Sequence, residues 1–348
     1  MLDVSQQPGE RYANIPLRNV GRFVVEPVVG RLGGSDEMSD SQPEINDGLD
    51  LVAEVDQRIG VAAMTTRFHD SRISDAIRYH LAAGGNRTRA RIAFRFGRSL
   101  GLSVNNALPL AVASEAVHNA SLILDDLQDR DSERRGQPSV WMAFGPEVAS
   151  LASHLLVSAG FSSLADPVYA SCTGDLVALF HSRIASTVYG QETDLFPGAT
   201  SDTAEPGDES VPWSSYVRGA IAKSGGLLSL PIEMPLIAAD RGFAVHIARR
   251  MMGHFATAYQ IIDDLADVAR DEHRQDKSAA PNAVSSLRHK SENRQPVDLA
   301  FKEAAREGKR ELDLALDLSH KIPGGCYSII SDECSRLLST AEKVISNA

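Results

Sequence analysis

The chain has little cysteine, no excess of positive charge and no long apolar run, and each shortage argues against a class of protein. Its three cysteines in 348 residues show neither metal-type spacing nor a disulfide framework, so we expect a reducing compartment, the cytoplasm. There are 35 Lys and Arg against 46 Asp and Glu, and the net charge of −11 would repel nucleic acid. No apolar run approaches the ~18 residues of a membrane span, and residues 1–10 lack a signal-peptide pattern. We therefore expect neither a nucleic-acid partner nor a transmembrane segment.

The order of polar and apolar segments predicts an all-α protein. Residues 1–50 mix proline, glycine, serine and acid, which predicts a loose N-terminal extension. From residue 51 onward, apolar residues recur at helical spacing in stretches too long for strands. These stretches are 107–124, 148–164, 175–189, 216–236, 244–268, 299–318 and 328–344. We expect one large helical domain over 51–348, with long polar connections at 197–212 and 271–296.

An acidic motif, Asp-Asp-x-x-Asp, occurs twice, each time at the end of an apolar helical run. The copies are Asp125, Asp126 and Asp129, and Asp263, Asp264 and Asp267. Side chains four residues apart share a helix face, so the first and last Asp of each copy point the same way. Crowded carboxylates repel one another, and a divalent cation relieves that repulsion most simply.

The chemistry of these ligands indicates magnesium. Hard oxygen ligands without paired His or Cys are typical of Mg²⁺, which completes its octahedron with water and phosphate oxygens. The alternative is two solvated acidic helix ends, although two such motifs after apolar runs are improbable by chance. The sequence therefore predicts a magnesium site whose cargo is a diphosphate.

With these motifs and the residues around them, the chain resembles the trans-isoprenyl diphosphate synthases, the polyprenyl synthetase family. After four intervening residues, Asp129 is followed by Arg134-Arg135-Gly136-Gln137-Pro138, which is similar to the family string DDxxD-x4-RRGxP. Further matches follow the family's order: 84–89 (Gly-Gly-Asn-Arg-Thr-Arg), His118-Asn119, 190–194 (Gly-Gln-Glu-Thr-Asp), Lys223-Ser224 and Tyr259-Gln260. The resemblance covers about residues 51–290.

The resemblance implies both a fold and a reaction. The fold is a single large helical bundle around a central apolar cavity, with the acidic motifs facing each other across its mouth, in a homodimer. The reaction is head-to-tail transfer, in which an allylic diphosphate condenses with isopentenyl diphosphate to give a trans-prenyl diphosphate. The implied cofactor is Mg²⁺, about three ions in each active site.

The resemblance also assigns roles to single residues. The metal ligands would be Asp125, Asp126, Asp129, Asp263, Asp264 and Asp267. The allylic diphosphate would be held by Arg134, Lys223 and Lys277, and isopentenyl diphosphate by Arg89, His118 and Arg135. Gln260, three residues before Asp263, would orient a metal-bound water or cap polar neighbours. Metal ligands together with Arg134 and Lys223 would carry the catalysis, and no protein nucleophile is needed.

Product length is expected to follow from the depth of the apolar cavity. In the family its floor is commonly set four and five residues before the first motif, which here are Ser121 and Ala120, about one helical turn before Asp125. Both are small, so the sequence favours geranylgeranyl diphosphate over farnesyl diphosphate, and a longer chain is a further alternative. The other interpretation is that small residues only allow helices to pack closely.

Several positions depart from the family pattern. Asn86 stands where Lys is usual, and Ala90 replaces the usual Pro. All six motif aspartates and the pair Arg134-Arg135 are intact, which favours an active enzyme. Two alternatives stay open. A class I terpene cyclase or head-to-head synthase would have no use for Arg89 as an isopentenyl ligand, and a non-catalytic partner subunit would fit the departures.

Overall fold

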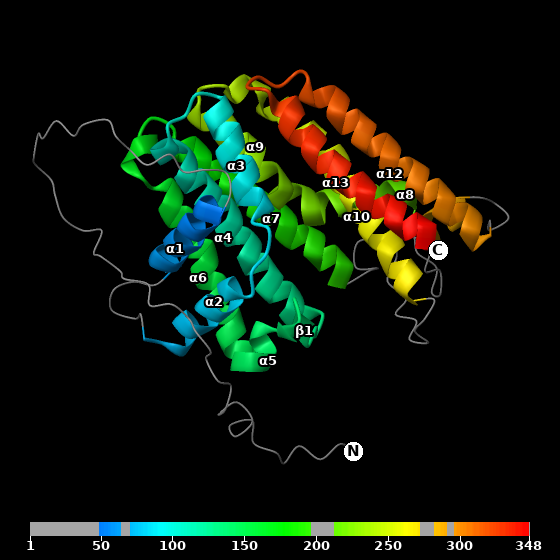
Figure 1. The fold of residues 1–348 in the computed structure, drawn as a ribbon, viewed down its shortest axis with the longest axis horizontal. Coiled ribbons are helices and arrows are strands. Elements are labelled where there is room, and N and C mark those ends of the chain that lie inside the picture. The colour runs from blue at the N-terminus through cyan, green and yellow to red at the C-terminus, as the bar shows by residue number, and fades with distance from the viewer. Residues whose placement is uncertain (1–48, 64–69, 196–211, 272–281, 291–295, 348) are drawn as a thin grey trace, which may run out of the picture. The chain divides into compact units, whose positions relative to one another are not determined.

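The computed structural model of the protein describes residues 49–63, 70–195, 212–271, 282–290 and 296–347. Apart from one short hairpin, the regular elements in these ranges are helical (Figure 1), which confirms the predicted all-α fold. By its contacts the chain forms two compact units, Met1–Arg91 with Leu108–Ala170 and Ile92–Ala107 with Ser171–Ala348. The single domain predicted over 51–348 stays a prediction.

The first unit is assembled around α6 (Pro146–Leu164). This helix packs against α1 (Leu49–Ala63), α2 (Arg72–Ala82) and α5 (Val140–Phe144). Gly145 separates α5 from α6 with a left-handed φ of 97°, a conformation that costs glycine little. Pro146 then occupies the first turn of α6, where a missing amide donor is tolerated. The 3-10 turn η1 (Pro167–Tyr169) follows α6.

Helix α4 (Val104–Gln128) has the length and apolar composition of a possible membrane span, alone among the helices described. The most apolar 18 residues of α4 are 78% buried inside the protein, as in a core helix. Glu115, His118 and Asn119 interrupt the apolar run in the sequence. A core helix passes the same test of length and composition, so α4 is weak evidence for a membrane span.

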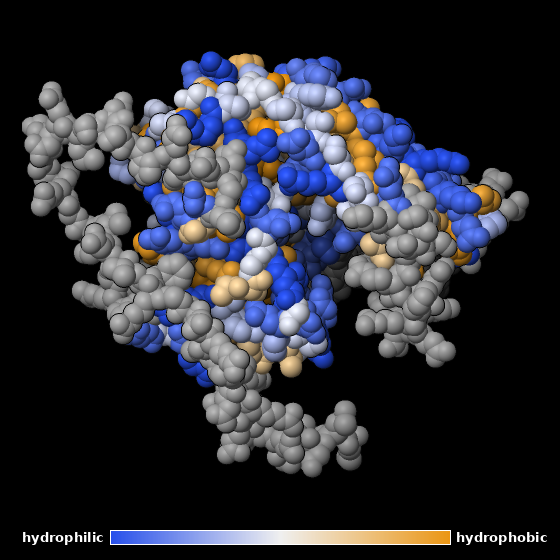
Figure 2. Space-filling model, viewed as in Figure 1, coloured by the Kyte–Doolittle hydropathy of each residue, from blue (hydrophilic) through white to orange (hydrophobic). Residues whose placement is uncertain are grey.

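The second unit centres on α10 (Val245–Asp271). It packs against α9 (Gly226–Ala238), α12 (Val297–Ser319) and α13 (Cys326–Asn347), and Figure 1 shows α12 and α13 beside it. The core brings Met251 and Phe255 of α10 together with Ile232, Leu312, Ile330 and, from α3 (Thr88–Ser99), Phe96. Hydrophilic residues make up most of the coloured surface seen in Figure 2.

The predicted helical stretches are confirmed, with ends shifted by a few residues. They correspond to α4, α6, α7 (Thr173–Leu195), α8 (Trp213–Ala220) continuing into α9, α10, α12 and α13. The connection predicted over 271–296 was wrong in part, because it contains α11 (Ala283–Lys290), whose Val284 and Leu287 are buried against α10 and α12. The extension 1–50, apart from the start of α1, and the connection at 197–212, apart from Pro212, lie outside the described residues.

Candidate active site

The first acidic motif forms the C-terminal end of α4. Asp125 is partly exposed, Asp126 is buried with 1% of its surface exposed, and Asp129 is exposed. The helix ends because Arg130 adopts a left-handed φ of 58° and the Asp131 amide donates back to the Asp126 carbonyl at 2.9 Å. The motif therefore places the Asp126 carboxylate inside the unit and the Asp129 carboxylate at its surface.

A short hairpin turns Arg134 back onto the first motif. Strands β1 (Glu133–Arg134) and β2 (Gln137–Pro138) pair antiparallel, and both turn residues, Arg135 and Gly136, have positive φ, at 54° and 77°. Two left-handed residues are typical of the tight type I′ turn. The period-two pattern expected of strands is absent because each strand has only two residues.

Within this hairpin Arg134 forms a forked ion pair with Asp126. Its Nε donates to both carboxylate oxygens at 2.7 and 2.8 Å, and its Nη2 lies 2.5 Å from Oδ1. Burial disfavours the charged guanidinium, but the hydrogen bonds and negative charge of Asp126 outweigh burial and raise the pKa of Arg134. Both oxygens of Asp126 thus accept hydrogen bonds from Arg134, whereas Asp125 and Asp129 have more exposed surface at which a metal ion could bind.

The three residues predicted to bind isopentenyl diphosphate lie near one another in the first unit. Burial lowers the pKa of His118 well below its usual value, and the positive charges of Arg89 and Arg135 lower it further. The positive charge of Arg134 also lowers the pKa of this imidazole. Three guanidinium groups therefore lie close enough to act on a neutral histidine that can donate a hydrogen bond, a set of groups that suits a polyanion.

A buried network of hydrogen bonds lies next to this group of cations. Glu115 on α4 accepts a hydrogen bond from the Ala90 amide at 3.1 Å, in the first turn of α3, where amides lack helical partners. Asn119 donates to the Glu115 carbonyl at 2.8 Å and pairs with Nε2 of His80 at 3.0 Å. Burial, followed by Arg135, lowers the pKa of His80 to about 3, so its ring is neutral. Sequence reasoning missed Glu115, although an acid inside an apolar helical run was a visible signal.

The second acidic motif lies near the C-terminal end of α10. Asp263 is exposed, whereas Asp264 is buried with 9% of its surface exposed. Oδ1 of Asp264 accepts from Gln260 at 2.9 Å, and Oδ2 accepts from the Tyr216 hydroxyl at 2.7 Å and the Ala283 amide at 2.8 Å. Burial raises the pKa of Asp264 to about 6 despite these three donors. This carboxylate joins α10 to α8 and to the first residue of α11, and Tyr216 was not predicted.

Lys223 lies on a π-helical segment, η2 (Ile221–Gly225), between α8 and α9. Such segments are rare and frequent at functional sites. Gly190 of α7 allows η2 to approach, because a Cβ there would lie 2.4 Å from the Lys223 amide nitrogen. Gly226, the first residue of α9, also lies close to the α7 backbone, because a Cβ there would lie 2.7 Å from the Arg183 carbonyl oxygen. The glycine of the 190–194 string is therefore explained by close backbone packing.

The two small residues expected to set product length have different surroundings. Ala120 is 1% exposed, and its carbonyl accepts a hydrogen bond from Ser153 of α6 at 3.0 Å. Ser121 is partly exposed, and its hydroxyl donates to the His118 carbonyl at 2.8 Å. The contact with α6 supports the packing interpretation for Ala120, while Ser121 keeps free surface.

The donor chemistry of the acidic motifs fits magnesium, although the described side chains do not form a complete coordination shell. Among the side chains that the structure describes, no group of three or more His, Cys, Asp or Glu could hold a metal ion. Mg²⁺ is usually bound by one or two carboxylates, with water and substrate phosphates completing its shell. Asp125, Asp129 and Asp263 can supply such ligands. Lys277 and the side chain of Asp267 lie outside the described residues.

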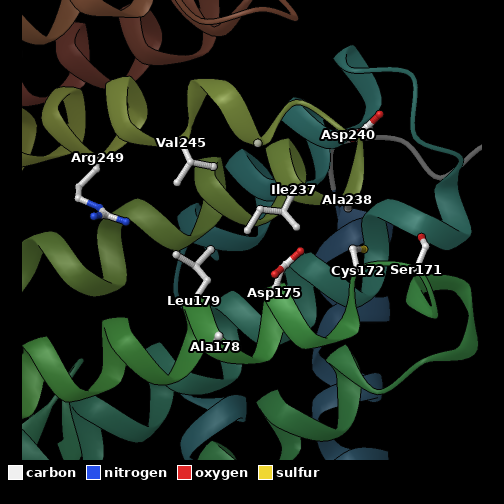
Figure 3. A pocket seen from close by; sticks show the side chains of 11 residues that line it. Ser171, Cys172, Asp175, Ala178, Leu179, Ile237, Ala238, Asp240, Val245 and Arg249 are labelled. Carbon is white, nitrogen blue, oxygen red and sulfur yellow. The ribbon is translucent and has the colours of Figure 1, made fainter.

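A separate cavity of about 730 Å³ opens in the second unit, between the start of α7, the end of α9 and the start of α10 (Figure 3). Leu179, Ile237 and Val245 line it together with Asp175 and Arg249. Arg249 precedes Asp263 by about 14 residues on one helix, which corresponds to about 21 Å. This cavity is remote from the second acidic motif, and the central apolar cavity stays a prediction.

Comparison with known proteins places the chain in a family. Residues 70–283 match the family model described as Polyprenyl synthetase. A geranylgeranyl diphosphate synthase of Cyanophora paradoxa is 31% identical over 209 residues, 59% of this chain and 69% of that protein. A (2E,6E)-farnesyl diphosphate synthase of Mycobacterium tuberculosis is 30% identical over 185 residues, 53% of this chain and 49% of that protein. The chain thus spans about half to two thirds of the length of these relatives.

Solved structures show the same fold. The polyprenyl synthase from Caulobacter crescentus complexed with calcium and isoprenyl diphosphate superposes with a TM-score of 0.66. The match covers 85% of this chain and 94% of that one at 17% identity. At this identity the likeness concerns the fold alone.

Proposed function

Because this chain belongs to the polyprenyl synthetase family, we propose that it is a magnesium-dependent trans-prenyl transferase. It condenses an allylic diphosphate with isopentenyl diphosphate, head to tail. The observation that carries this proposal is the group of cations near His118. Arg89, Arg135 and Arg134 each act electrostatically on this imidazole, and Arg134 also pairs with Asp126 of the first acidic motif. A second diphosphate site next to the first motif is what a condensation of two diphosphates requires.

The cations around His118 bind the diphosphate of isopentenyl diphosphate. Arg89 and Arg135 supply charge-assisted hydrogen bonds to its oxygens. His118 stays neutral because burial and the neighbouring arginines depress its pKa, so it donates one hydrogen bond without adding repulsion. The homoallylic double bond is then held at a fixed place beside the allylic substrate, which lowers the entropic part of the barrier.

The acidic motifs and their basic neighbours bind the allylic diphosphate. Mg²⁺ held by Asp125, Asp129 and Asp263 would neutralise the charge that develops on the leaving diphosphate. Arg134 and Lys223 add fixed positive charge to the same leaving group. Asp126 and Asp264 have supporting roles. Asp126 holds the Arg134 guanidinium in place, and Asp264 joins α10 to Tyr216 and α11.

The reaction needs a dry site as well as charge compensation. Breakage of the allylic C–O bond gives a carbocation and free diphosphate, and water would quench the cation to an alcohol. The isopentenyl double bond attacks the cation, a C–C bond forms, and the released diphosphate takes the proton that is lost. The apolar residues that precede each acidic motif, such as Ile123 and Ile262, keep water away from this step.

The product of this reaction is expected to be geranylgeranyl diphosphate. The reason is the small side chain at Ser121, which retains free surface one helical turn before Asp125. The test is incubation with Mg²⁺, isopentenyl diphosphate and each of several allylic diphosphates, followed by chromatography of the products. A longer prenyl diphosphate supports the proposal, and its chain length reports the depth of the cavity. The absence of any elongation at saturating substrate would refute the function.

One observation favours a second candidate, a non-catalytic partner subunit. Asn86 is exposed at the edge of the segment that carries Arg89, at a position where the family usually has a charged Lys. Loss of that charge weakens the isopentenyl site. Under this candidate, the purified protein alone is inactive, and a mixture with an active synthase gives a different product distribution from the synthase alone.

Two further properties are part of the same proposal. The protein forms a homodimer and acts in the cytoplasm, where the sparse cysteines stay reduced. Light scattering after gel filtration tests the dimer, which is expected at about twice the chain mass of 37.5 kDa. A mass equal to that of one chain would contradict it.

A further inference from the structure

Arg87 is a structural arginine inside the basic segment 84–89. It is buried, with 2% of its surface exposed, and its φ of 46° is left-handed. Its Nε and Nη2 donate to the two carboxylate oxygens of Asp56 at 2.6 and 2.9 Å. Nη1 donates to the Gly84 carbonyl at 2.7 Å, and Nη2 donates also to the Leu81 carbonyl at 2.8 Å. Because it makes four hydrogen bonds within the protein, this guanidinium has a structural role.

The Gly84 carbonyl has a second donor, Nη1 of Arg135. The neighbouring Gly85 lies against the same guanidinium, since a Cβ at residue 85 would lie 2.6 Å from its Nη2 and 2.7 Å from its Nη1. Gly85 also has a φ of 122°, which side chains rarely adopt. Arg135 therefore docks on the backbone of residues 84 and 85. The place of that backbone is fixed in turn by Arg87.

Asp56 is the carboxylate that holds this arrangement from α1. Its side chain is 19% exposed and that of Arg87 is 1% exposed, so the pair is shielded from water. A buried guanidinium that loses its carboxylate keeps an uncompensated charge. That charge would act on Arg135, whose pKa is already lowered by burial and then by the positive charge of Arg87. Asp56 thus both fixes Arg87 and screens Arg135 from it.

We propose that Asp56 is a positioning residue for the diphosphate of isopentenyl diphosphate. It acts through Arg87 and the Gly84 carbonyl, which together set the place of the Arg135 guanidinium. Asp56 touches no substrate itself, and the inference rests on the proposed function. Its consequence is selective, because the chain of contacts ends at Arg135 and not at Lys223 or the second acidic motif.

The test measures KM for each substrate separately in Asp56→Asn. We expect KM for isopentenyl diphosphate to rise about 10- to 100-fold, the value of one or two charge-assisted hydrogen bonds, with KM for the allylic substrate unchanged. Arg87→Lys is the second variant, because it keeps the buried charge paired but cannot span Asp56 and Gly84 with one fork. It should show the same selective rise. Glu54→Gln is the matched control, since it removes an α1 carboxylate that pairs with Arg58 at the surface.

The outcomes separate this inference from the function on which it rests. An unchanged KM for isopentenyl diphosphate in either folded variant, or an equal rise for both substrates, would overturn the positioning role while the wild-type protein still elongates. If Asp56→Asn does not fold, Arg87→Lys decides. A wild-type protein without elongation refutes the function instead. In that case, calorimetric binding of inorganic pyrophosphate still compares Asp56→Asn with wild type, and equal affinity would overturn the link to Arg135.

Discussion

At the scale of residues, each acidic motif contains a buried carboxylate that binds protein donors and at least one carboxylate with exposed surface. The middle residues, Asp126 and Asp264, are buried and fully engaged with protein donors. The outer residues Asp125, Asp129 and Asp263 retain exposed surface. A carboxylate that binds metal and one that orders the protein differ in what their loss removes, so the two kinds can be told apart by experiment.

Asp125→Asn and Asp126→Asn should therefore differ in stability more than in activity. Asp125→Asn is expected to lower kcat about 100-fold or more, because it removes a proposed metal ligand, with a smaller change in melting temperature than Asp126→Asn. Asp126→Asn should lower kcat and also destabilise the protein by about 3 kcal/mol, because Arg134 loses its charged partner. Turnover assays and thermal unfolding check both. Glu133→Gln, an exposed acid on β1, is the control, and an unchanged melting temperature in Asp126→Asn would contradict this division.

The raised pKa of Asp264 predicts a dependence of stability on pH. In the unfolded chain this carboxyl has its ordinary pKa of 3.8, whereas in the folded protein burial raises its pKa to about 6. The folded state binds the proton more tightly, so its contribution is complete below pH 4 and is lost as the pH rises through 6. The free energy of unfolding of wild type minus that of Asp264→Asn should fall by at most about 3 kcal/mol over this range.

Denaturant unfolding in the presence of a chelator, at pH values from 4 to 7, measures this difference. The subtraction cancels other groups that titrate nearby in pH, such as His80, whose pKa is lowered to about 3. A difference that stays constant across the range would show that Asp264 is ionised in the folded protein even at pH 4.

At the scale of elements, the close packing of α7 against η2 requires glycine at residue 190. Gly190→Ala would place a Cβ 2.4 Å from the Lys223 amide, and the backbone of η2 can give way only by moving Lys223. We expect a loss of about 1 to 3 kcal/mol in stability together with a lower kcat. Gly174→Ala in the same helix has open space around its Cβ position and should be neutral or slightly stabilising. Equal effects of the two changes would contradict this account.

The long elements of this protein were predictable from its sequence, and the short ones were not. Helices such as α10 and α12 carry a periodic apolar face over many residues, so the pattern alone locates them. Helix α11 has eight residues and follows a polar, proline-containing stretch, and its burial comes from contacts with α10 and α12. The hairpin at residues 133–138 depends on two left-handed turn residues, one of them Arg135, which a residue pattern does not reveal.

The sequence indicated the motif residues of the proposed site, but not the residues that support them. Arg89 and Arg135 act electrostatically on His118, while their binding of isopentenyl diphosphate stays a prediction. The roles of Asp56, Tyr216 and Glu115 were missed, because each acts on a residue far away in sequence. A buried acid pairs with whatever donor the fold brings to it, and only coordinates show which donor that is.

At the scale of the whole molecule, the proposed function requires an acidic protein to bind two acidic substrates. The net charge of −11 repels a diphosphate at long range, so local cations have to overcome that field. In the first unit Arg89, Arg134 and Arg135 supply such cations, and the acidic motifs supply none until a metal ion is bound. Binding of the diphosphate and binding of the metal should therefore be coupled.

This coupling predicts a thermal shift that needs both ligands together. Mg²⁺ with inorganic pyrophosphate, each far above its dissociation constant, should raise the melting temperature by about 5 °C, because ligands that bind only the folded state stabilise it by mass action. Pyrophosphate with a chelator, or Mg²⁺ alone, should give a much smaller shift. Asp125→Asn should lose most of the metal-dependent part and keep the shift that Arg89 and Arg135 provide. A full shift with pyrophosphate and chelator would mean that arginines alone hold the ligand, and the metal role of the acidic motifs would be wrong.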